Sequence, residues 1–423
     1  MNKKRYRILY IQKTSGGGSV ISLYEFLRGL DMDTYEPIVL FFSPNFYHHQ
    51  FKAIGAKVLT LFDKPPKMPT QISQRDIAKT LRYISVLLAE GYRNAKQIYL
   101  MALKDWPLSR QIAGLIKDNA IDLVHHNYAL TNNLAGVMAA RMACVRQICH
   151  IRKFDHLSFI DKYMTRFVSS FIYISKAVKE NYQNQGVPSN MGDVIYNPFD
   201  GNSFKNKYIS SQILSDFGLT EKDRIITNVG RLDWWKGHDY FLQAIAEVIK
   251  TEPNIKVLIV GSTGERMKCQ KYYLRLQKLV SELNLSNFVI FTGFRPDIPH
   301  ILSASDILVH SASEPEPFGR VAVEGMLAGL PVIATAAGGI LEIIEDQVTG
   351  ILIPPKNVNA LTKAIKKLLN NQLLAKRLGN CAQKSALKRF SLNGHVKAVE
   401  TIYSKILKSD KVECDKILHS NEK

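Results

Sequence analysis

The stretch IITNVGRLDWWKGHDYFLQAIAEVIK, residues 225–250, decides the fold class. It opens with a short apolar, β-branched run at 225–229, which is typical of a buried strand. A loop with two glycines follows, and residues 239–250 then place apolar side chains at the spacing of an amphipathic helix. A buried strand that leads into a helix is the building unit of a parallel sheet covered by helices.

The same alternation runs along the whole chain. We expect strands at 7–11, 37–42, 57–61, 123–125, 147–150 and 171–174, and a second series at 225–229, 256–260, 289–291, 307–309, 331–334 and 350–353. Helices fit between them, for instance at 320–328 and 358–369. This predicts an α/β protein with two Rossmann-like, doubly wound parallel-sheet domains facing across a cleft, with ligands outside the carboxyl ends of the strands.

The stretch VIYNPFDGNSF, residues 194–204, has the Asn, Pro and Gly of a linker between the two series. We therefore expect one domain at 1–197, a second at 198–387 and a polar tail at 409–423. A C-terminal helix at about 388–408 is a candidate to pack back onto the first domain. Residues 63–117 are expected to form a helix-rich insertion in that domain.

Composition narrows the class of function. The 423 residues carry a formal net charge of +19, which favours phosphate-bearing ligands or an anionic lipid surface, although a general preference for lysine explains it equally well. No nucleic-acid recognition motif accompanies the charge. The five cysteines form no CxxC pair, which argues against a disulfide framework or a zinc site and favours a reducing cytoplasm. No apolar run reaches the roughly 18–20 residues of a membrane-spanning helix.

Two cations follow the strand at 225–229. Arg231 and Lys236 stand in the loop before the next helix. A guanidinium can bind two oxygens while an ammonium acts as a point charge, so the pair suits a diphosphate. This stretch alone leaves open that both are solvated surface charges.

The stretch EPEPFGRVAVEGMLAGLPVIAT, residues 314–335, follows the strand at 307–309. Its helix is expected to begin at Gly319, Arg320 and Val321, where free N–H groups can bind an anion. Glu316 lies in the preceding loop and Glu324 one turn into the helix, where carboxylates can accept hydrogen bonds from sugar hydroxyls. The alternative is an acidic pair that only stabilises the helix dipole.

A glycine pair closes this region. Gly338 and Gly339, in TAAGGILEII at 335–344, permit close backbone approach to a ligand, or form only a tight turn.

Taken together, these pieces resemble glycosyltransferase family 4, the glycosyl transferases group 1, which have the GT-B fold. The signatures are Arg-x4-Lys-Gly after a strand, here Arg231 to Gly237, and Glu-x7-Glu framed by Phe-Gly, here Glu316 to Glu324. The resemblance covers nearly all of residues 220–370. It implies that Arg231 and Lys236 hold the donor diphosphate, Glu316 the transferred sugar as a catalytic residue, Glu324 the ribose, and the backbone of Gly319, Arg320 and Val321 the phosphates.

The N-terminal half resembles the same family more weakly. KTSGGGSV at 13–20 is similar to the glycine loop of the family, which implies that Gly17 and Gly18 lie near the donor or acceptor. DLVHHNYA at 122–129 is similar to a strand end of the family, but Asn127 replaces a second His. ICHIRKF at 148–154 implies that His150 contacts sugar or phosphate as a catalytic residue, with Arg152 as a further candidate.

The resemblance implies a retaining transfer of a sugar from a nucleotide-diphosphate sugar, bound mostly by the second domain, to an acceptor bound by the first. We expect no metal and no cofactor, because Arg231, Lys236 and a helix amino end can neutralise the leaving diphosphate. The expected acceptor is a sugar or lipid-linked sugar in cell-surface polysaccharide, lipopolysaccharide or glycolipid biosynthesis. Basic and apolar residues interleave at 79–110, which makes an anionic membrane surface a candidate partner. We therefore expect a cytoplasmic protein, with a peripheral position on the inner face of the cell membrane as the alternative. A nucleotide-sugar epimerase, a phosphorylase or a non-catalytic nucleotide-sugar-binding partner remain the alternatives.

Overall fold

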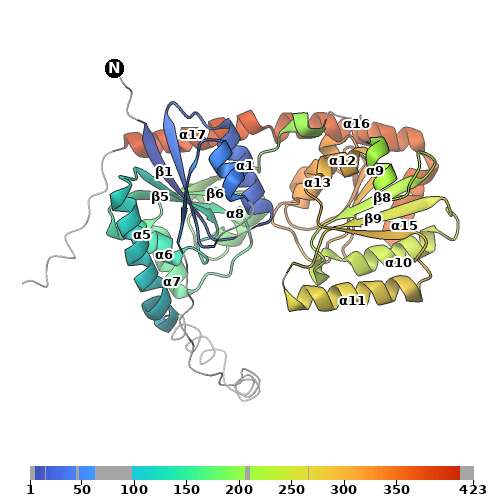
Figure 1. The fold of residues 1–423 in the computed structure, drawn as a ribbon, viewed down its shortest axis with the longest axis horizontal. Helices are drawn as coiled ribbons and strands as arrows, with labels where there is room; N and C mark the ends of the chain where they lie inside the picture. Colours follow the sequence, from blue (N-terminus) through green and yellow to red (C-terminus); the bar gives the residue numbers. More distant parts are fainter. Residues whose placement is uncertain are drawn as a thin grey trace, which may run out of the picture. The chain divides into compact units, whose positions relative to one another are not determined.

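The computed structural model describes residues 5–14, 16–43, 47–61, 98–204, 210–264 and 266–409, which form two compact units (Figure 1). Unit 1 holds the described residues of Met1–Ile174, Val178–Ile195 and Val396–Lys423. Unit 2 holds Ser175–Ala177 and the described residues of Tyr196–His395. The chain therefore leaves unit 1 near residue 195 and returns to it near residue 396.

Unit 1 is built on a parallel sheet with the strand order β3-β2-β1-β4-β5-β6-β7. Neighbouring strands pair in parallel throughout this sheet. Such a sheet is covered on both faces, which explains why its strands are nearly continuous apolar runs. The strands are β1 (Tyr6–Gln12), β2 (Tyr35–Phe41), β3 (Lys57–Thr60), β4 (Leu123–Tyr128), β5 (Arg146–Ile151), β6 (Ser170–Tyr173) and β7 (Gly192–Val194).

Helices cover both faces of this sheet (Figure 1). On one face, Leu9 and Ile11 of β1 share a core cluster with residues of α5 (Trp106–Asp118) and α6 (Leu134–Met142). On the other face, Tyr10 lies edge-on to Phe26 of α1 (Gly18–Gly29). The remaining helical segments of this part of the chain are α2 (His48–Ala53), the π-helix η1 (Met101–Asp105), α7 (Phe159–Met164), η2 (Thr165–Phe167), α8 (Lys176–Gln183) and η3 (Ser189–Met191).

The helix α17 (Leu392–Lys408) supplies part of the second face of unit 1. Tyr403 is fully buried, and its hydroxyl lies 2.5 Å from Nδ1 of His125 on β4. The same hydroxyl donates to the hydroxyl of Tyr10 on β1, at 3.1 Å. Residues almost 400 positions apart thus share one core.

Unit 2 is built on a second parallel sheet, with the order β10-β9-β8-β11-β12-β13. The strands are β8 (Arg224–Val229), β9 (Ile255–Val260), β10 (Val289–Gly293), β11 (Ile307–His310), β12 (Val332–Thr335) and β13 (Ile351–Ile353). Buried residues of β8, β9 and β11 share one core cluster with α10 (His238–Val248), α11 (Met267–Glu282) and α15 (Val358–Asn370). The other helical segments are η4 (Gly201–Phe204), α9 (Ser210–Asp216), η6 (Trp234–Lys236), α12 (Ile298–Ser303), α13 (Arg320–Leu327), α14 (Ile340–Ile343) and α16 (Gln372–Arg389).

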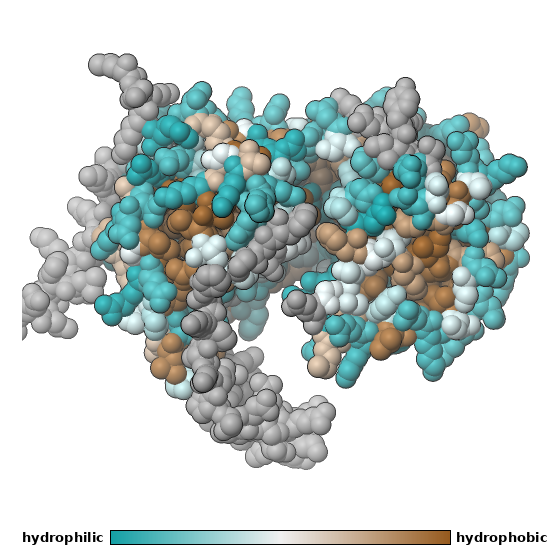
Figure 2. Space-filling view, in the orientation of Figure 1, coloured by the Kyte–Doolittle hydropathy of each residue, from teal (hydrophilic) through white to brown (hydrophobic). Residues whose placement is uncertain are grey.

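The fold class predicted from the sequence is confirmed: both units are doubly wound parallel sheets. All twelve expected strands are present, with their ends shifted by at most three residues. Strand β7 was not expected, because its three residues, Gly-Asp-Val, carry no apolar periodicity. The surface in Figure 2 shows hydrophilic residues around the rim of each unit, with apolar residues between them.

Other expectations meet the structure only in part. Of the insertion at 63–117, the structure describes residues 98–117, which are helical, whereas most of the segment 79–110 and the tail from 410 lie outside the described residues. Within the described ranges, no helix is long and apolar enough to cross a membrane. Cys149, Cys269 and Cys381 are free thiols. Cys144, however, is disulfide-bonded, which the argument against a disulfide framework did not anticipate.

Candidate active site

Three loops of unit 2 meet where neighbouring strands end. Strands β8, β11 and β12 are adjacent in the sheet, so the segments after Val229, His310 and Thr335 emerge at one edge. The N–H of Ser313 donates to the carbonyl of Trp235 at 2.8 Å, which ties the second loop to the first. The predicted residues Arg231, Lys236 and Glu316 all lie on these loops.

Glu316 is the centre of this cluster. Its carboxylate is only 8 % exposed, and it accepts a charge-assisted hydrogen bond from Nζ of Lys236, which is 14 % exposed. Nε2 of His310, the last residue of β11, lies 3.2 Å from the same carboxylate oxygen. Burial by itself would raise the pKa of Glu316, but the attraction of Lys236 and His310 outweighs it and holds the pKa well below the usual value. Glu316 is therefore an anion at any physiological pH.

The loop after β8 is folded so that Lys236 reaches Glu316. Residues Trp234–Lys236 form one turn of 3-10 helix, and Gly237 then takes a left-handed conformation with φ 67° before α10 begins. A Cβ at Gly237 would lie 2.0 Å from the carbonyl oxygen of Ser311, so only glycine fits. The ammonium of Lys236 also sits 4.4 Å from the ring centre of Trp235, a cation–π contact.

Arg231 is held more loosely than Lys236. Its side chain is 41 % exposed, and Nη2 lies 3.4 Å from Asp233. Its carbonyl lies 3.2 Å from Nε2 of the buried His238, and because a carbonyl can only accept, Nε2 carries the proton. Burial lowers the pKa of His238 to about 4, so this ring is neutral at pH 7. The backbone of Arg231 is thus fixed while its guanidinium remains available to a ligand.

The amino end of α13 lies beside this cluster along the chain. Gly319 precedes the helix with φ 109°, and the first N–H groups of a helix, here those of Arg320 and Val321, have no partner within it. The side chain of Arg320 is turned to local contacts: it lies 3.6 Å from Glu324 and 4.2 Å from the ring centre of Phe199. Burial raises the pKa of Glu324, and the charge of Arg320 partly offsets this. The backbone, rather than the Arg320 side chain, is therefore the part of this segment that could bind an anion.

The glycine pair after β12 has a structural partner. The N–H of Gly339 donates to the carbonyl of Glu316 at 2.8 Å, and Glu316 and Gly338 form an isolated β-bridge. A Cβ at Gly338 would lie 2.3 Å from the Glu316 carbonyl oxygen. The close approach that these glycines permit is thus to the backbone of Glu316, which they hold in place.

The predicted residues of the N-terminal half lie in unit 1, also at strand ends. Gly17 has φ 87° and precedes α1, which begins at Gly18; both are exposed. His150 is buried near the end of β5, and its ring stacks on that of His125 at 5.5 Å. Nη2 of Arg152 lies 3.1 Å from Nδ1 of His150.

Some members of these clusters were not predicted from the sequence. His310 and Trp235 contact Glu316 or Lys236, and Asn127 of β4 accepts a hydrogen bond from Arg152 at 2.8 Å. His310 is the last residue of β11, and the rule that ligand-binding residues lie at the carboxyl ends of parallel strands could have identified it. No sequence pattern indicates Trp235, because its contact depends on the fold of the loop.

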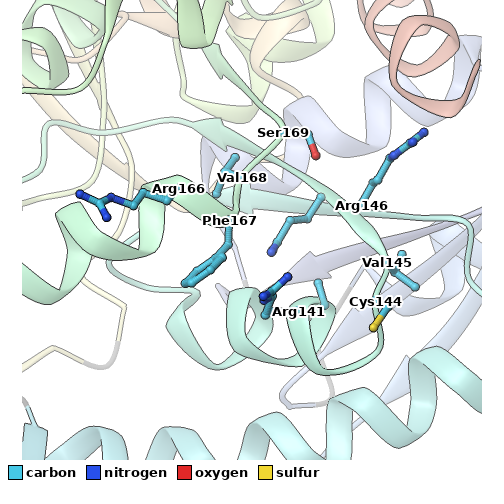
Figure 3. Close-up of a pocket in the computed structure, with 10 residues that line it drawn as sticks. Arg141, Cys144, Val145, Arg146, Arg166, Phe167, Val168 and Ser169 are labelled. Atoms are coloured by element: carbon cyan, nitrogen blue, oxygen red, sulfur yellow. The ribbon is translucent and has the colours of Figure 1, made fainter. Parts of the chain in front are cut away.

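A cavity of about 180 Å³ lies at the other edge of the sheet of unit 1, beside the first residues of β5 and β6 (Figure 3). Arg146 and Arg166 line it but point in different directions (Figure 3). Arg146 donates to the carbonyl of Ser409 at 2.7 Å and so caps the end of α17. Arg146 and Arg166 therefore form no common anion site. Elsewhere in the described ranges, no group of three or more His, Cys, Asp or Glu is placed to hold a metal ion.

Comparison with known proteins gives consistent results. Residues 211–385 match the family Glycosyl transferases group 1, and residues 16–202 match Glycosyltransferase Family 4. Over 339 residues the chain is 23 % identical to N-acetyl-alpha-D-glucosaminyl L-malate synthase of Bacillus anthracis, covering 78 % of this chain and 86 % of that protein. A 158-residue stretch, 37 % of this chain and 39 % of the relative, is 32 % identical to 2-deoxystreptamine glucosyltransferase of Streptomyces kanamyceticus.

Solved structures share the fold. The structure of Anabaena Alr3699/HepE in complex with UDP and glucose matches with a TM-score of 0.78 at 23 % identity, over 95 % of this chain and 100 % of that chain. A glycosyltransferase from Rickettsia africae matches with a TM-score of 0.78 at 21 % identity, over 96 % and 100 %.

Proposed function

Since the chain belongs to the family 4 glycosyltransferases of GT-B fold, we propose that it transfers a sugar from a nucleotide-diphosphate sugar to an acceptor with retention of the anomeric configuration. The observation that carries this proposal is the Lys236–Glu316 pair at the strand ends of unit 2. It holds together one cation suited to a phosphate and one carboxylate suited to sugar hydroxyls.

Each residue of unit 2 has a proposed role. Arg231 and Lys236 bind the donor diphosphate, and the N–H groups at Arg320 and Val321 meet its oxygens. Glu316 accepts hydrogen bonds from the transferred sugar, and Glu324 from the ribose. UDP-glucose is the first donor to test, because the Anabaena relative was solved with UDP and glucose.

We propose that the leaving diphosphate is neutralised by the protein and not by a metal. Two cations and a helix amino end act on the charge that develops as the glycosidic bond breaks. Glu316 already pairs with Lys236, so we assign it to binding and not to nucleophilic attack. Departure and attack then occur on the same face of the sugar, with a phosphate oxygen of the donor accepting the acceptor proton.

The test is to incubate the protein with candidate donors, with and without cell-lipid extract. Release of the free nucleotide and formation of a new glycoside are then measured. The anomeric configuration of the product is read by NMR, and each reaction is repeated with EDTA. A new glycoside of inverted configuration would refute retention. Activity lost with EDTA and restored by a divalent ion would refute the metal-free proposal, and an isomerised donor without a glycoside would indicate an epimerase.

For the acceptor, we propose a lipid-linked sugar at an anionic membrane surface, used in making a surface polysaccharide, lipopolysaccharide or glycolipid. Support comes from the charge of +19 and from exposed aromatic side chains on unit 1. Tyr99 and Trp106, at the start of the helix that contains α5, and Phe159 and Tyr163 of α7 are each at least 47 % exposed. Aromatic side chains beside basic ones suit the lipid headgroup region.

Co-sedimentation with vesicles tests this part separately. The protein should pellet with anionic vesicles at low salt and be released at about 0.5 M salt, because the attraction is screened. Neutral vesicles are the control, and Trp106→Ala should weaken the pelleting. Protein that stays in the supernatant with anionic vesicles at low salt would make a soluble acceptor the better assignment.

A further inference from the structure

A buried arginine lies next to His150, the histidine that the family resemblance implies contacts sugar or phosphate. Arg152 follows β5 and is only 8 % exposed, and His150 is 1 % exposed. Nη2 of Arg152 lies 3.1 Å from Nδ1 of His150, and Nε of Arg152 donates to Oδ1 of Asn127 at 2.8 Å. One guanidinium therefore contacts the ends of two neighbouring strands.

The chemistry of arginine fixes the state of the histidine. A guanidinium has only donors and keeps its proton in proteins. Nδ1 of His150 must therefore accept and carry a lone pair, because an N–H there would face the N–H of Arg152. The ring proton then resides on Nε2, and the ring is neutral. Which ring nitrogen carries the proton is usually set in this way, by the hydrogen bond that the other nitrogen makes.

The same arginine also orients the neighbouring amides. Because Oδ1 of Asn127 accepts from Arg152, its Nδ2 donates, to Oε1 of Gln12 at 2.5 Å and to the carbonyl of Ser19 at 3.1 Å. Nε2 of Gln12 then donates to the carbonyl of Thr14 at 3.0 Å, at the start of the glycine loop. The hydrogen bonds thus run in one direction from Arg152 to the loop that precedes α1.

We propose that Arg152 is a positioning residue that locks His150 as the neutral tautomer protonated on Nε2. His150 then acts as a hydrogen-bond donor to a substrate oxygen and not as a base that takes a proton. The role of His150 at the substrate rests on the proposed function, whereas its tautomer does not. The two claims can therefore fail separately.

The tautomer is measured on the unliganded full-length protein at neutral pH, from the ring ¹⁵N and ¹H correlations of labelled histidine, with His150→Gln to assign the signals. We expect an unprotonated Nδ1 that accepts a hydrogen bond and a protonated Nε2. In Arg152→Met, the Nδ1 signal should move downfield, toward the value of a ring nitrogen without a hydrogen bond. A wild-type ring with a proton on Nδ1, or on both nitrogens, would overturn the proposal whatever the enzyme transfers.

Kinetics provide the second readout. Arg152→Met should lower kcat about ten- to hundredfold, as loss of an orienting hydrogen bond commonly does, while KM for the donor changes less than about threefold. Arg152→Lys should recover part of kcat, since it retains one cationic donor. The matched control is Arg166→Met, which removes an exposed arginine of the same unit and should change kcat less than about twofold.

Substitution of the histidine itself separates donor from base. A glutamine amide nitrogen can take the place of Nε2, whereas an asparagine reaches only the position of Nδ1. His150→Gln should therefore retain more activity than His150→Asn by about tenfold. Equal losses in both, or a larger loss in His150→Gln, would contradict the donor role, and would leave the donor-binding assignments in unit 2 intact.

Discussion

At the scale of single residues, the Lys236–Glu316 pair determines the charge and the placement of two groups of the candidate site. Both side chains are largely shielded from water, so removal of one charge takes from the other its nearest charged partner. A diphosphate that approaches Lys236 gives the ammonium a second anionic partner while Glu316 remains ionised. The pair thus keeps both groups charged and in place before the donor arrives.

The first prediction concerns the two cations of this loop. Arg231→Ala or Lys236→Ala removes charge-assisted hydrogen bonds of about 1.5–3 kcal/mol each, so kcat/KM should fall roughly ten- to hundredfold or more. Steady-state kinetics with the best donor measures this. The control is Lys250→Ala, a solvent-exposed lysine of the same unit that pairs with Glu247 on the surface. Near wild-type efficiency in Lys236→Ala would show that the diphosphate binds elsewhere.

The second prediction separates the two glutamates. Glu324→Ala should weaken binding of the bare nucleoside diphosphate, whose ribose we assign to Glu324, by about tenfold. Glu316→Ala should leave nucleotide affinity within about threefold and mainly reduce turnover of the sugar donor. Calorimetry with the nucleotide, beside kinetics with the sugar donor, tests both. The division of roles is wrong if the two variants lose nucleotide affinity to the same extent.

A third prediction follows from the buried histidine. The pKa of His238 is lowered to about 4, whereas in the unfolded chain it is about 6.5. Between these values the unfolded chain binds a proton that the folded chain does not, so the free energy of unfolding of unit 2 should decrease as the pH falls from 6.5 to 4, by up to about 3 kcal/mol. His238→Gln removes the titrating group and should flatten this slope.

Urea denaturation at several pH values measures the effect. Trp234 and Trp235 lie in the loop after β8 of unit 2, Trp106 lies in unit 1, and these are the three tryptophans of the chain. In a Trp106→Phe background, the fluorescence therefore reports on unit 2 alone. An unchanged slope in His238→Gln would mean that other groups carry the pH dependence.

Much of the candidate site could be predicted from residue types and spacing. Arg231, Lys236, Glu316 and the start of α13 stand out because cations, carboxylates and glycines follow apolar strands. Direct pairing of Lys236 with Glu316 could not be predicted, because the two lie 80 positions apart and their side chains meet only through the order of the strands. The same reason hides the contact of Arg152 with His150, which depends on where each side chain points.

At the scale of the elements, tight turns after the strands determine where the side chains of the candidate site lie. Gly237 ends the loop after β8, and Gly319 precedes α13; both have positive φ. Each of these glycines lies directly before a helix, at the end of a loop that carries residues of the candidate site. The position of Lys236 therefore depends on the backbone that only Gly237 allows.

A fourth prediction tests this dependence. Gly237→Ala forces a Cβ to within 2.0 Å of the Ser311 carbonyl at φ 67°, so unit 2 should lose more than about 2 kcal/mol of stability. Gly114→Ala is the matched control, because its Cβ meets nothing within 4 Å and it lies inside α5, where the exchange should stabilise by about 0.5–1 kcal/mol. Thermal denaturation of both variants measures the contrast. Equal effects of the two exchanges would contradict it.

The sequence predicted long elements better than short ones. Apolar strands such as β1 and helices such as α15 have enough residues for their periodicity to show. Strand β7 has three residues, and the bonds that make it a strand come from its neighbour β6. Such an element is a product of the assembled sheet and cannot be recognised from its own residues.

At the scale of the whole molecule, unit 1 is completed by a segment from the other end of the chain. Val399 and Tyr403 of α17 are fully buried, and Tyr403 contacts β1 and β4 through its hydroxyl. Removal of this helix would expose an apolar face of the sheet and leave Tyr10 and His125 without this partner. Unit 2 ends at His395, within the first turn of α17.

The fifth prediction follows from that division. A chain that stops after His395 should retain a cooperatively folded unit 2, while unit 1 loses most of its stability. Hydrogen exchange on intact and shortened chains is the measurement: protection should be lost at residues 6–41 and retained at 255–260 and 358–370. The milder control Tyr403→Phe keeps the ring and should cost about 1 kcal/mol. Full protection of residues 6–41 in the shortened chain would refute the role of α17.

The return of α17 to unit 1 has a consequence for biosynthesis. A ribosome makes the strands of unit 1 first, at about 5–20 residues per second. Their core lacks α17 until about residue 408 has left the exit tunnel, by which time all of unit 2 has been translated. The domain that is synthesised first is therefore the one that is completed last, and part of one face of its sheet stays uncovered while unit 2 is translated.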